Sequence, residues 1–160
     1  MVRVGFGTDS HRFTRSSRKP LVLGGVRVGD TGGLLANSDG DVILHALFNA
    51  LSQACGGDSI GVYADPLLEQ GVTDSRSYLK IPLGMVRDLG YRVHNVGIMV
   101  EALRPRLSPP VIARMRRSIA DLVGVEEGSV GLTFTSGEGL TRFGRGRGML
   151  AQAIVSLLRT

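Results

Sequence analysis

The chain of 160 residues suits one domain, and its hydrophobic content of 42% supplies a real core and excludes a disordered chain. Its net charge of +5 favours anionic partners, such as phosphorylated small molecules or nucleic acid. The apolar runs are short and broken by charge, so none is predicted to span a membrane.

The first half of the chain begins with apolar alternation and then changes to a helical period. Residues 2–7 and 20–28 are predicted strands, joined as a hairpin around the basic loop RFTRSSRKP. Residues 39–55 carry apolar groups at helical spacing and are predicted to form a helix, followed by a glycine- and aspartate-rich loop. We expect a cytoplasmic protein, because the N-terminus has no apolar signal region and the single cysteine cannot form an internal disulfide.

The second half alternates helices and strands. The predicted elements are a helix capped by Thr73 or Ser75 and ending near Leu89, a strand over 91–101, a helix over 108–125, a strand over 128–136 and a closing helix over 148–158. This order predicts an α/β (α+β) fold, a small mixed sheet with helices on one face, in a single domain over residues 1–160.

Two histidines and an aspartate are candidate metal ligands. Asp9 and His11 are two residues apart on a predicted strand, so their side chains point to the same side. If the next helix begins near the end of this strand, His45 becomes a third ligand, and the set suits Zn²⁺ with one open position. Asp41, one turn before His45, would orient its ring or cap the helix. The alternative is a surface His11 and a hydrogen-bonded core His45.

The glycine-rich stretch TSGEGLTRFGRGRG, residues 135–148, is a candidate phosphate site. Small residues at the end of a strand expose backbone N–H groups, and the predicted closing helix begins close by. Glu138 in this polar stretch could hold a hard cation such as Mg²⁺. Two alternatives are a helix cap with a tight turn, and an RGG-type RNA-binding segment. The segment EALRPRLSPP, residues 101–110, could clamp a phosphate with its two arginines.

The motifs, taken together, resemble one enzyme family. The segments GFGTDSHRF, LLANSDGDVILHAL, TDSRSYL, NVGIMVEALRPRLSP and TFTSGEGLTRFGRGRG occur in the order found in 2-C-methyl-D-erythritol 2,4-cyclodiphosphate synthases. The resemblance implies a homotrimer with active sites between adjacent subunits. It also implies a metal-dependent lyase, which converts 4-diphosphocytidyl-2-C-methyl-D-erythritol 2-phosphate to the cyclodiphosphate and releases CMP.

The resemblance further implies a role for individual residues. Asp9, His11 and His45 would hold Zn²⁺ or another transition metal, and Glu138 would hold Mg²⁺ or Mn²⁺. Asn37, Ser136 and Glu138 would be catalytic. The implied substrate-binding residues are Asp9, Ser10, His11, Asn37, Ser38, Asp58, Asp65, Ala102, Arg106, Leu107, Thr135, Ser136 and Arg145.

Some positions depart from the family pattern. Asn37 stands in the place of a histidine, Asn49 in that of an aspartate, Arg106 in that of a lysine and Arg147 in that of a glutamate. These departures motivate one alternative function, a diverged homologue that keeps the fold and metal site but has weak or lost cyclase activity. A second alternative, a basic nucleic-acid-binding module, depends on the charge and on RFGRGRG. The leading interpretation has no nucleic-acid or membrane partner.

Overall fold

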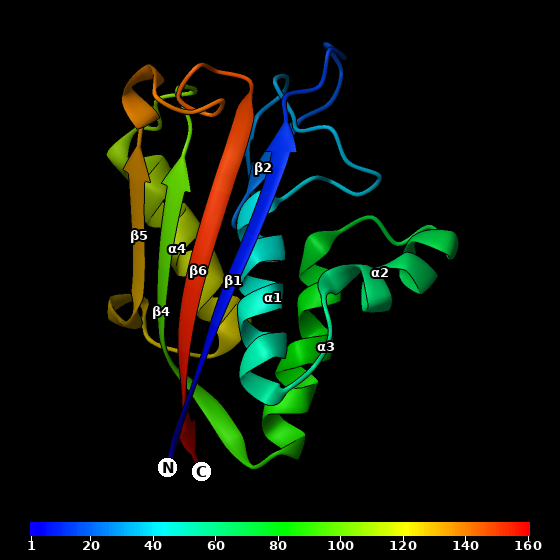
Figure 1. The fold of residues 1–160 in the computed structure, drawn as a ribbon, viewed down its shortest axis with the longest axis vertical. Coiled ribbons are helices and arrows are strands. Elements are labelled where there is room, and N and C mark those ends of the chain that lie inside the picture. The colour runs from blue at the N-terminus through cyan, green and yellow to red at the C-terminus, as the bar shows by residue number, and fades with distance from the viewer.

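A four-stranded mixed sheet forms one layer of the computed structural model, which describes residues 1–160 (Figure 1). The strands lie in the order β1-β6-β4-β5, and β4 and β5 are parallel while the other neighbours are antiparallel. Their bounds are β1 (Val2–Arg12), β4 (Tyr91–Glu101), β5 (Val130–Thr135) and β6 (Gly148–Arg159). A small mixed sheet was the sequence-based prediction, and it is confirmed.

Helices cover only one face of this sheet (Figure 1). Helix α1 (Val42–Cys55) packs on β1 and β6, α3 (Ser75–Asp88) packs on α1, and α4 (Pro109–Val123) contacts β5. Helix α2 (Ile60–Glu69) contacts α1 and α3. None of the helices has both the length and the apolar content that a bilayer crossing requires.

Helix α1 is the central helix, and it lies unusually close to β1. Nearly all of its side chains are buried. Gly5 and Gly7 of β1 face it, and a Cβ at Gly7 would lie 2.2 Å from the carbonyl oxygen of Ala46. Glycine is therefore required at this position of β1, and the strand and helix backbones are in direct contact.

The predicted closing helix over 148–158 is wrong, because these residues form β6. Methionine, alanine, glutamine and leucine favour helices, which explains the prediction. In the structure every second residue is buried against the helices, and the buried set is Met149, Ala151, Ala153, Val155 and Leu157. Pairing with β1 on one side and β4 on the other overrides the helical propensity of this segment.

Two further predictions for the first half of the chain need correction. The strand at the N-terminus extends to Arg12 and pairs with β6, whereas residues 20–28 form a separate hairpin of β2 (Leu21–Leu23) and β3 (Val26–Gly29). The glycine- and aspartate-rich segment after α1 contains α2, which was predicted as loop. The buried Ala64 and the partly buried Ile60 and Leu68 stabilise this helix by packing on the core.

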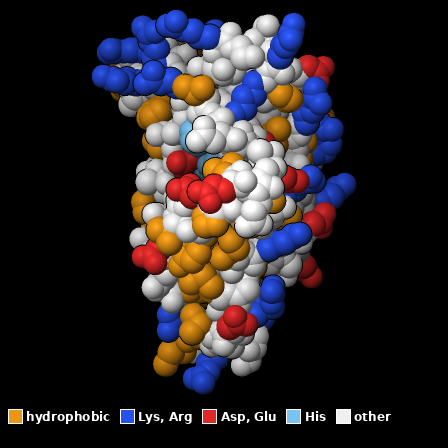
Figure 2. Space-filling model, turned by 90° about the vertical axis from the view of Figure 1, so that its right-hand side faces the viewer, with side chains coloured by type: hydrophobic (Ala, Val, Ile, Leu, Met, Phe, Trp, Pro, Cys, Tyr) orange, Lys and Arg blue, Asp and Glu red, His pale blue; other side chains and the backbone are white.

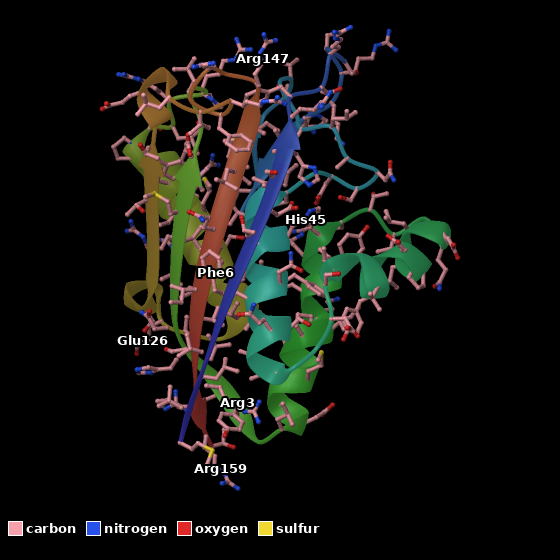
Figure 3. All side chains as sticks on the ribbon, in the orientation of Figure 1. Arg3, Phe6, His45, Glu126, Arg147 and Arg159 are labelled. Carbon is pink, nitrogen blue, oxygen red and sulfur yellow. The ribbon has the colours of Figure 1, made fainter.

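The opposite face of the sheet carries exposed apolar side chains. Val2, Val4 and Phe6 of β1, Met99 of β4 and Ile154 of β6 are between 43% and 60% exposed. Figure 3 shows Phe6 on this face, in front of the sheet and away from the helices. An exposed apolar patch that extends over neighbouring strands is typical of an interaction surface.

Candidate metal centre and adjoining pocket

Asp9, His11 and His45 converge at the end of β1. Asp9 and His11 follow Gly7 at every second residue of β1, so they lie on the same face of the strand, the face that α1 covers. His45 lies in the first turn of α1 and is only 7% exposed. The close contact between β1 and α1 therefore brings the three side chains together, as the sequence predicted.

The donor atoms of the three residues have the spacing of ligands to one ion. The Asp9 Oδ2 atom lies 2.9 Å from His11 Nε2 and 3.1 Å from His45 Nδ1, and the two ring nitrogens are 3.2 Å apart. Bonds of about 2.0–2.1 Å to a tetrahedral Zn²⁺ place its ligand atoms about 3.3–3.4 Å apart. A carboxylate and two imidazoles also suit a divalent transition metal chemically. The triad fits such a metal.

The Asp9 carboxyl is adapted to stay ionised at this position. Burial alone would raise the pKa of Asp9, but hydrogen bonds from His11 and His45 and attraction to their rings lower it well below its ordinary range. A carboxylate that remains ionised at all physiological pH values is a permanently available metal ligand.

The second ring nitrogen of His45 faces the helix α3. Its Nε2 atom lies 2.9 Å from Ser75 Oγ and 3.4 Å from Ser38 Oγ. Asp41 does not contact the ring. It caps α1 instead, because its carboxylate accepts the N–H of Leu44, and it also accepts the N–H groups of Gly24 and Gly25. Of the two roles predicted for Asp41, only capping is confirmed.

A pocket of about 380 Å³ opens beside the triad. Besides the three ligands, it is lined by Asn37, Ser38 and Asp65, three residues that the sequence implicates in substrate binding, and by residues of α2. Figure 2 shows histidine side chains in a hollow of this face, with arginine and lysine side chains at the top and acidic side chains beside them. The pocket therefore places carboxylate, amide and hydroxyl groups beside the metal site, and none of its lining residues is a lysine or an arginine.

Three of the other predicted site residues lie in two recesses near this pocket. Asp58 lines a shallow recess with Asn49, whose amide donates to the carbonyl oxygen of Thr8 and accepts the N–H of Ile60. Ser10 and Arg145 line a cavity of about 770 Å³ at the end of the sheet, and its other basic residues are Arg12, Arg15, Arg142 and Arg147. Figure 3 shows Arg147 at this end. Such a concentration of arginines is suited to anions.

The remaining predicted residues follow β4 and β5, the two strands of the sheet that are farthest from β1. They are Ala102, Arg106 and Leu107 after β4, and Thr135, Ser136 and Glu138 at the end of β5. Three strand spacings separate β5 from β1, which is about 14 Å. A single chain therefore holds the metal triad and the residues that follow β5 at opposite edges of the sheet.

The glycine-rich turn after β5 differs from its prediction. No helix begins after it, since residues 148–159 are β6, so the expected helix N-terminus is absent. The hydroxyls of Thr135 and Ser136 instead accept the backbone N–H groups of Gly137 and Glu138. Glu138 itself is exposed and has a φ of 46°, a left-handed conformation that residues other than glycine rarely adopt. Phosphate binding by backbone N–H groups at this turn remains a prediction.

Sequence reasoning missed the residues of α3 that contact His45. Ser75, expected only as a possible helix cap, contacts the ring, while the actual cap of α3 is Asp74. The ring of Tyr78 lies with its centroid 6.4 Å from that of His45. No local pattern could reveal these neighbours, because α3 follows His45 by 30 residues and reaches it only through the packing of α3 on α1.

The fold and the triad together define an α/β domain with a candidate site for a divalent metal beside a pocket. Comparison with known proteins gives the particular family. A model of the YgbB family matches residues 2–158, so the chain belongs to the YgbB family.

Named relatives and solved structures agree with this assignment. The 2-C-methyl-D-erythritol 2,4-cyclodiphosphate synthases of Chlamydia muridarum and Chlamydia abortus are 41% and 42% identical to it over 158 residues. That alignment covers 98% of this chain in both cases, and 88% and 89% of the relatives.

A structure of the bifunctional IspDF from Campylobacter jejuni superposes with a TM-score of 0.89 at 33% identity, covering 100% of this chain and 43% of that one. A 2C-methyl-D-erythritol-2,4-cyclodiphosphate synthase in a CDP-bound form superposes with a TM-score of 0.86 at 31% identity, covering 98% of this chain and 100% of that one. The resemblance found in the sequence is therefore confirmed.

Proposed function

We propose that the chain is a 2-C-methyl-D-erythritol 2,4-cyclodiphosphate synthase. Its substrate is 4-diphosphocytidyl-2-C-methyl-D-erythritol 2-phosphate, and its products are the cyclic diphosphate and CMP. The observation that carries this proposal is the convergence of Asp9, His11 and His45 beside a pocket, in a chain that belongs to the YgbB family. Family membership favours this activity over a nucleic-acid-binding module.

The reaction requires two anionic groups to approach each other. An oxygen of the 2-phosphate attacks the β-phosphorus, the bond from this phosphorus to the CMP oxygen breaks, and CMP leaves with the electron pair. Two unit charges 4 Å apart repel by about 4 kcal/mol at an effective dielectric constant of 20. Neutralising phosphate charge is therefore a large part of catalysis, and no protein nucleophile is needed.

We assign Zn²⁺ to the triad and Mg²⁺ or Mn²⁺ to Glu138. A metal at such a site supplies Lewis-acid charge to phosphate oxygens. With a metal bound, the triad would fix the position of that charge at the side of the pocket. Cys55 is excluded as a ligand, because it lies at the opposite end of α1 from His45.

The surrounding residues bind the two ends of the substrate. Asn37, Ser38, Asp58 and Asp65 hold the methylerythritol part through hydroxyl, amide and carboxylate groups, and Asn37 donates its N–H to negative charge that develops in the transition state. The second set binds the nucleotide and its phosphates, and comprises Ala102, Arg106, Leu107, Thr135, Ser136 and Glu138. Ser10 and Arg145 are further substrate-binding residues, and both line the arginine-rich cavity next to His11.

A homotrimer reconciles these assignments with the separation of the two groups of residues. One chain holds the triad about 14 Å from Thr135, Ser136 and Glu138 across the sheet, so the β5 edge of one subunit would have to meet the β1 edge of the next to complete a site. The exposed apolar face of β1, β6 and β4 offers the surface for this contact. A cytoplasmic location remains our prediction.

The proposal is tested by following CMP release from the cytidine substrate with Zn²⁺ and Mg²⁺ present. His45→Ala should lose bound zinc and turnover. His94→Ala is the matched control, because His94 is exposed on β4 and outside the triad, and it should behave as the unmodified chain. A protein that binds zinc but releases no CMP would be the diverged homologue, and our assignment of activity would be wrong.

A further inference from the structure

Both ring nitrogens of His45 have partners, although only one can face the metal. Nδ1 points to Asp9 and His11, and Nε2 lies 2.9 Å from Ser75 Oγ. We infer that Ser75, held by Asp39, is a positioning residue that fixes the His45 ring with its proton on Nε2 and its Nδ1 lone pair directed at the metal. This inference rests on the proposed metal site.

The hydrogen-bond directions in this chain of groups follow from the donors available. The hydroxyl of Ser75 makes a very short hydrogen bond to Oδ1 of Asp39. An ionised carboxylate only accepts, so the single hydroxyl proton of Ser75 is donated to Asp39. The oxygen of Ser75 then has only lone pairs to offer to His45. The Nε2 atom of His45 must therefore carry a proton, so in the neutral ring that binds a metal the lone pair is on Nδ1.

Asp39 is itself fixed, so it can impose this direction. Its Oδ1 atom accepts the N–H of Asp41 at 3.1 Å, and its Oδ2 atom accepts the N–H of Ser75 at 3.0 Å. Its own backbone N–H donates to the carbonyl oxygen of Thr73 at 2.9 Å. These bonds join the loop before α1 to the start of α3. The carboxylate is thereby held by two segments of the chain and has little freedom to turn away.

Because Ser75 and His45 are both buried, a water molecule could not easily take the place of the Ser75 hydroxyl. Ser75 is 1% exposed and His45 is 7% exposed. The other polar atom near Nε2, the Ser38 hydroxyl, lies at 3.4 Å and also accepts the N–H of Gly40. Loss of the Ser75 hydroxyl would leave the Nε2 proton with one long contact, and the ring would lose its preferred orientation. Removal of such an outer partner typically costs 10- to 100-fold in metal affinity.

The experiment measures zinc affinity by competition with a chromogenic chelator, on metal-free protein of each variant. Ser75→Ala should bind zinc 10- to 100-fold more weakly. Ser77→Ala, the same change two residues along α3, is the control and should stay within threefold of the unmodified chain, since no hydrogen bond of the Ser77 side chain is seen. Asp39→Asn changes the acceptor of the Ser75 hydroxyl proton and should also weaken zinc binding. It serves as the second variant should Ser75→Ala not fold.

A second readout separates positioning from general stability. In the zinc-loaded protein, exchange of the His45 Nε2 proton with water, followed by NMR of ¹⁵N-histidine, should be slow. Ser75→Ala should accelerate it at least tenfold, and Ser77→Ala should not. If the unmodified chain binds no zinc, the proposed metal site itself fails. If it binds zinc and Ser75→Ala and Asp39→Asn match it in affinity and exchange, only the positioning role is overturned.

Discussion

The contact between β1 and α1 can be tested with one added methyl group. In Gly7→Ala, the new Cβ would lie 2.2 Å from the carbonyl oxygen of Ala46 and 2.4 Å from the backbone nitrogen of Ala50. Cβ atoms essentially never come closer than 3.0 Å to such atoms. The helix must therefore retreat from the strand by roughly 1 Å, because both clashing atoms belong to rigid helical backbone.

This displacement should affect both stability and the metal site. Overpacking of this kind costs about 1–3 kcal/mol, which for a chain of this size lowers Tm by roughly 3–10 °C. The same movement carries His45 away from Asp9, so their donor atoms, now 3.1 Å apart, would separate to about 4 Å, beyond the ~3.3 Å spacing of ligands on one zinc. Zinc affinity should fall at least tenfold.

Thermal unfolding followed by circular dichroism, together with a zinc competition assay, measures both effects. Gly84→Ala is the matched control. Gly84 lies within α3, and its nearest neighbour would be a flexible arginine side chain at 3.9 Å. This control should gain roughly 0.5–1 kcal/mol from helix propensity and keep its zinc affinity. If Gly7→Ala melts and binds zinc as the unmodified chain does, β1 and α1 are not in the contact described.

Three further outcomes follow from the same structure. Burial raises the pKa of Asp41 from its ordinary 3.8 to about 6. The hydrogen bonds that its carboxylate accepts from the N–H groups of Gly25, Leu44 and Gly24 lower the pKa, but burial has the larger effect. The folded state therefore binds this proton more tightly than the unfolded state, and the stability that Asp41 contributes is full below about pH 4 and lost as pH rises to about 6. Denaturant unfolding from pH 4 to 8 measures the free energy of unfolding of the unmodified chain and of Asp41→Asn. The difference between the two should fall as pH rises, and a difference that does not change with pH would refute the raised pKa. Phe6→Glu should dissociate the proposed trimer and abolish CMP release without unfolding the subunit, as measured by native mass spectrometry, and an intact trimer would count against the open sheet face as its interface. Asn49→Ala removes the bonds to Thr8 and Ile60 and should raise KM for the substrate several-fold by releasing the segment that carries Asp58, while zinc content stays unchanged.

Local patterns predicted the elements whose own side chains decide their conformation. Helix α1 has apolar residues all along it, α4 begins with two prolines in its first turn, and β4 carries an apolar run of strand length. The same logic placed Asp9 and His11 on one side of β1. Pattern reasoning was sufficient wherever local propensity and tertiary packing agree.

It failed where distant partners decide the conformation. The segment from Met149 to Leu157 has helix-forming composition, yet it is a strand because β1 and β4 supply its hydrogen bonds. The role of Ser75 was equally hidden, since a serine next to a helix cap has no local feature that points to His45. Tertiary contacts over 30 residues or more determine both.

The position of β6 between β1 and β4 has a consequence for how the protein is made. Strand β1 has only β6 as a neighbour in the sheet, and about 135 residues separate the two along the chain. A nascent polypeptide therefore exits the ribosome with its first strand unpaired until β6 has been synthesised. Asp9 and His11 lie on this unpaired strand β1. We therefore expect zinc to be acquired only after translation of β6, as a late step of maturation.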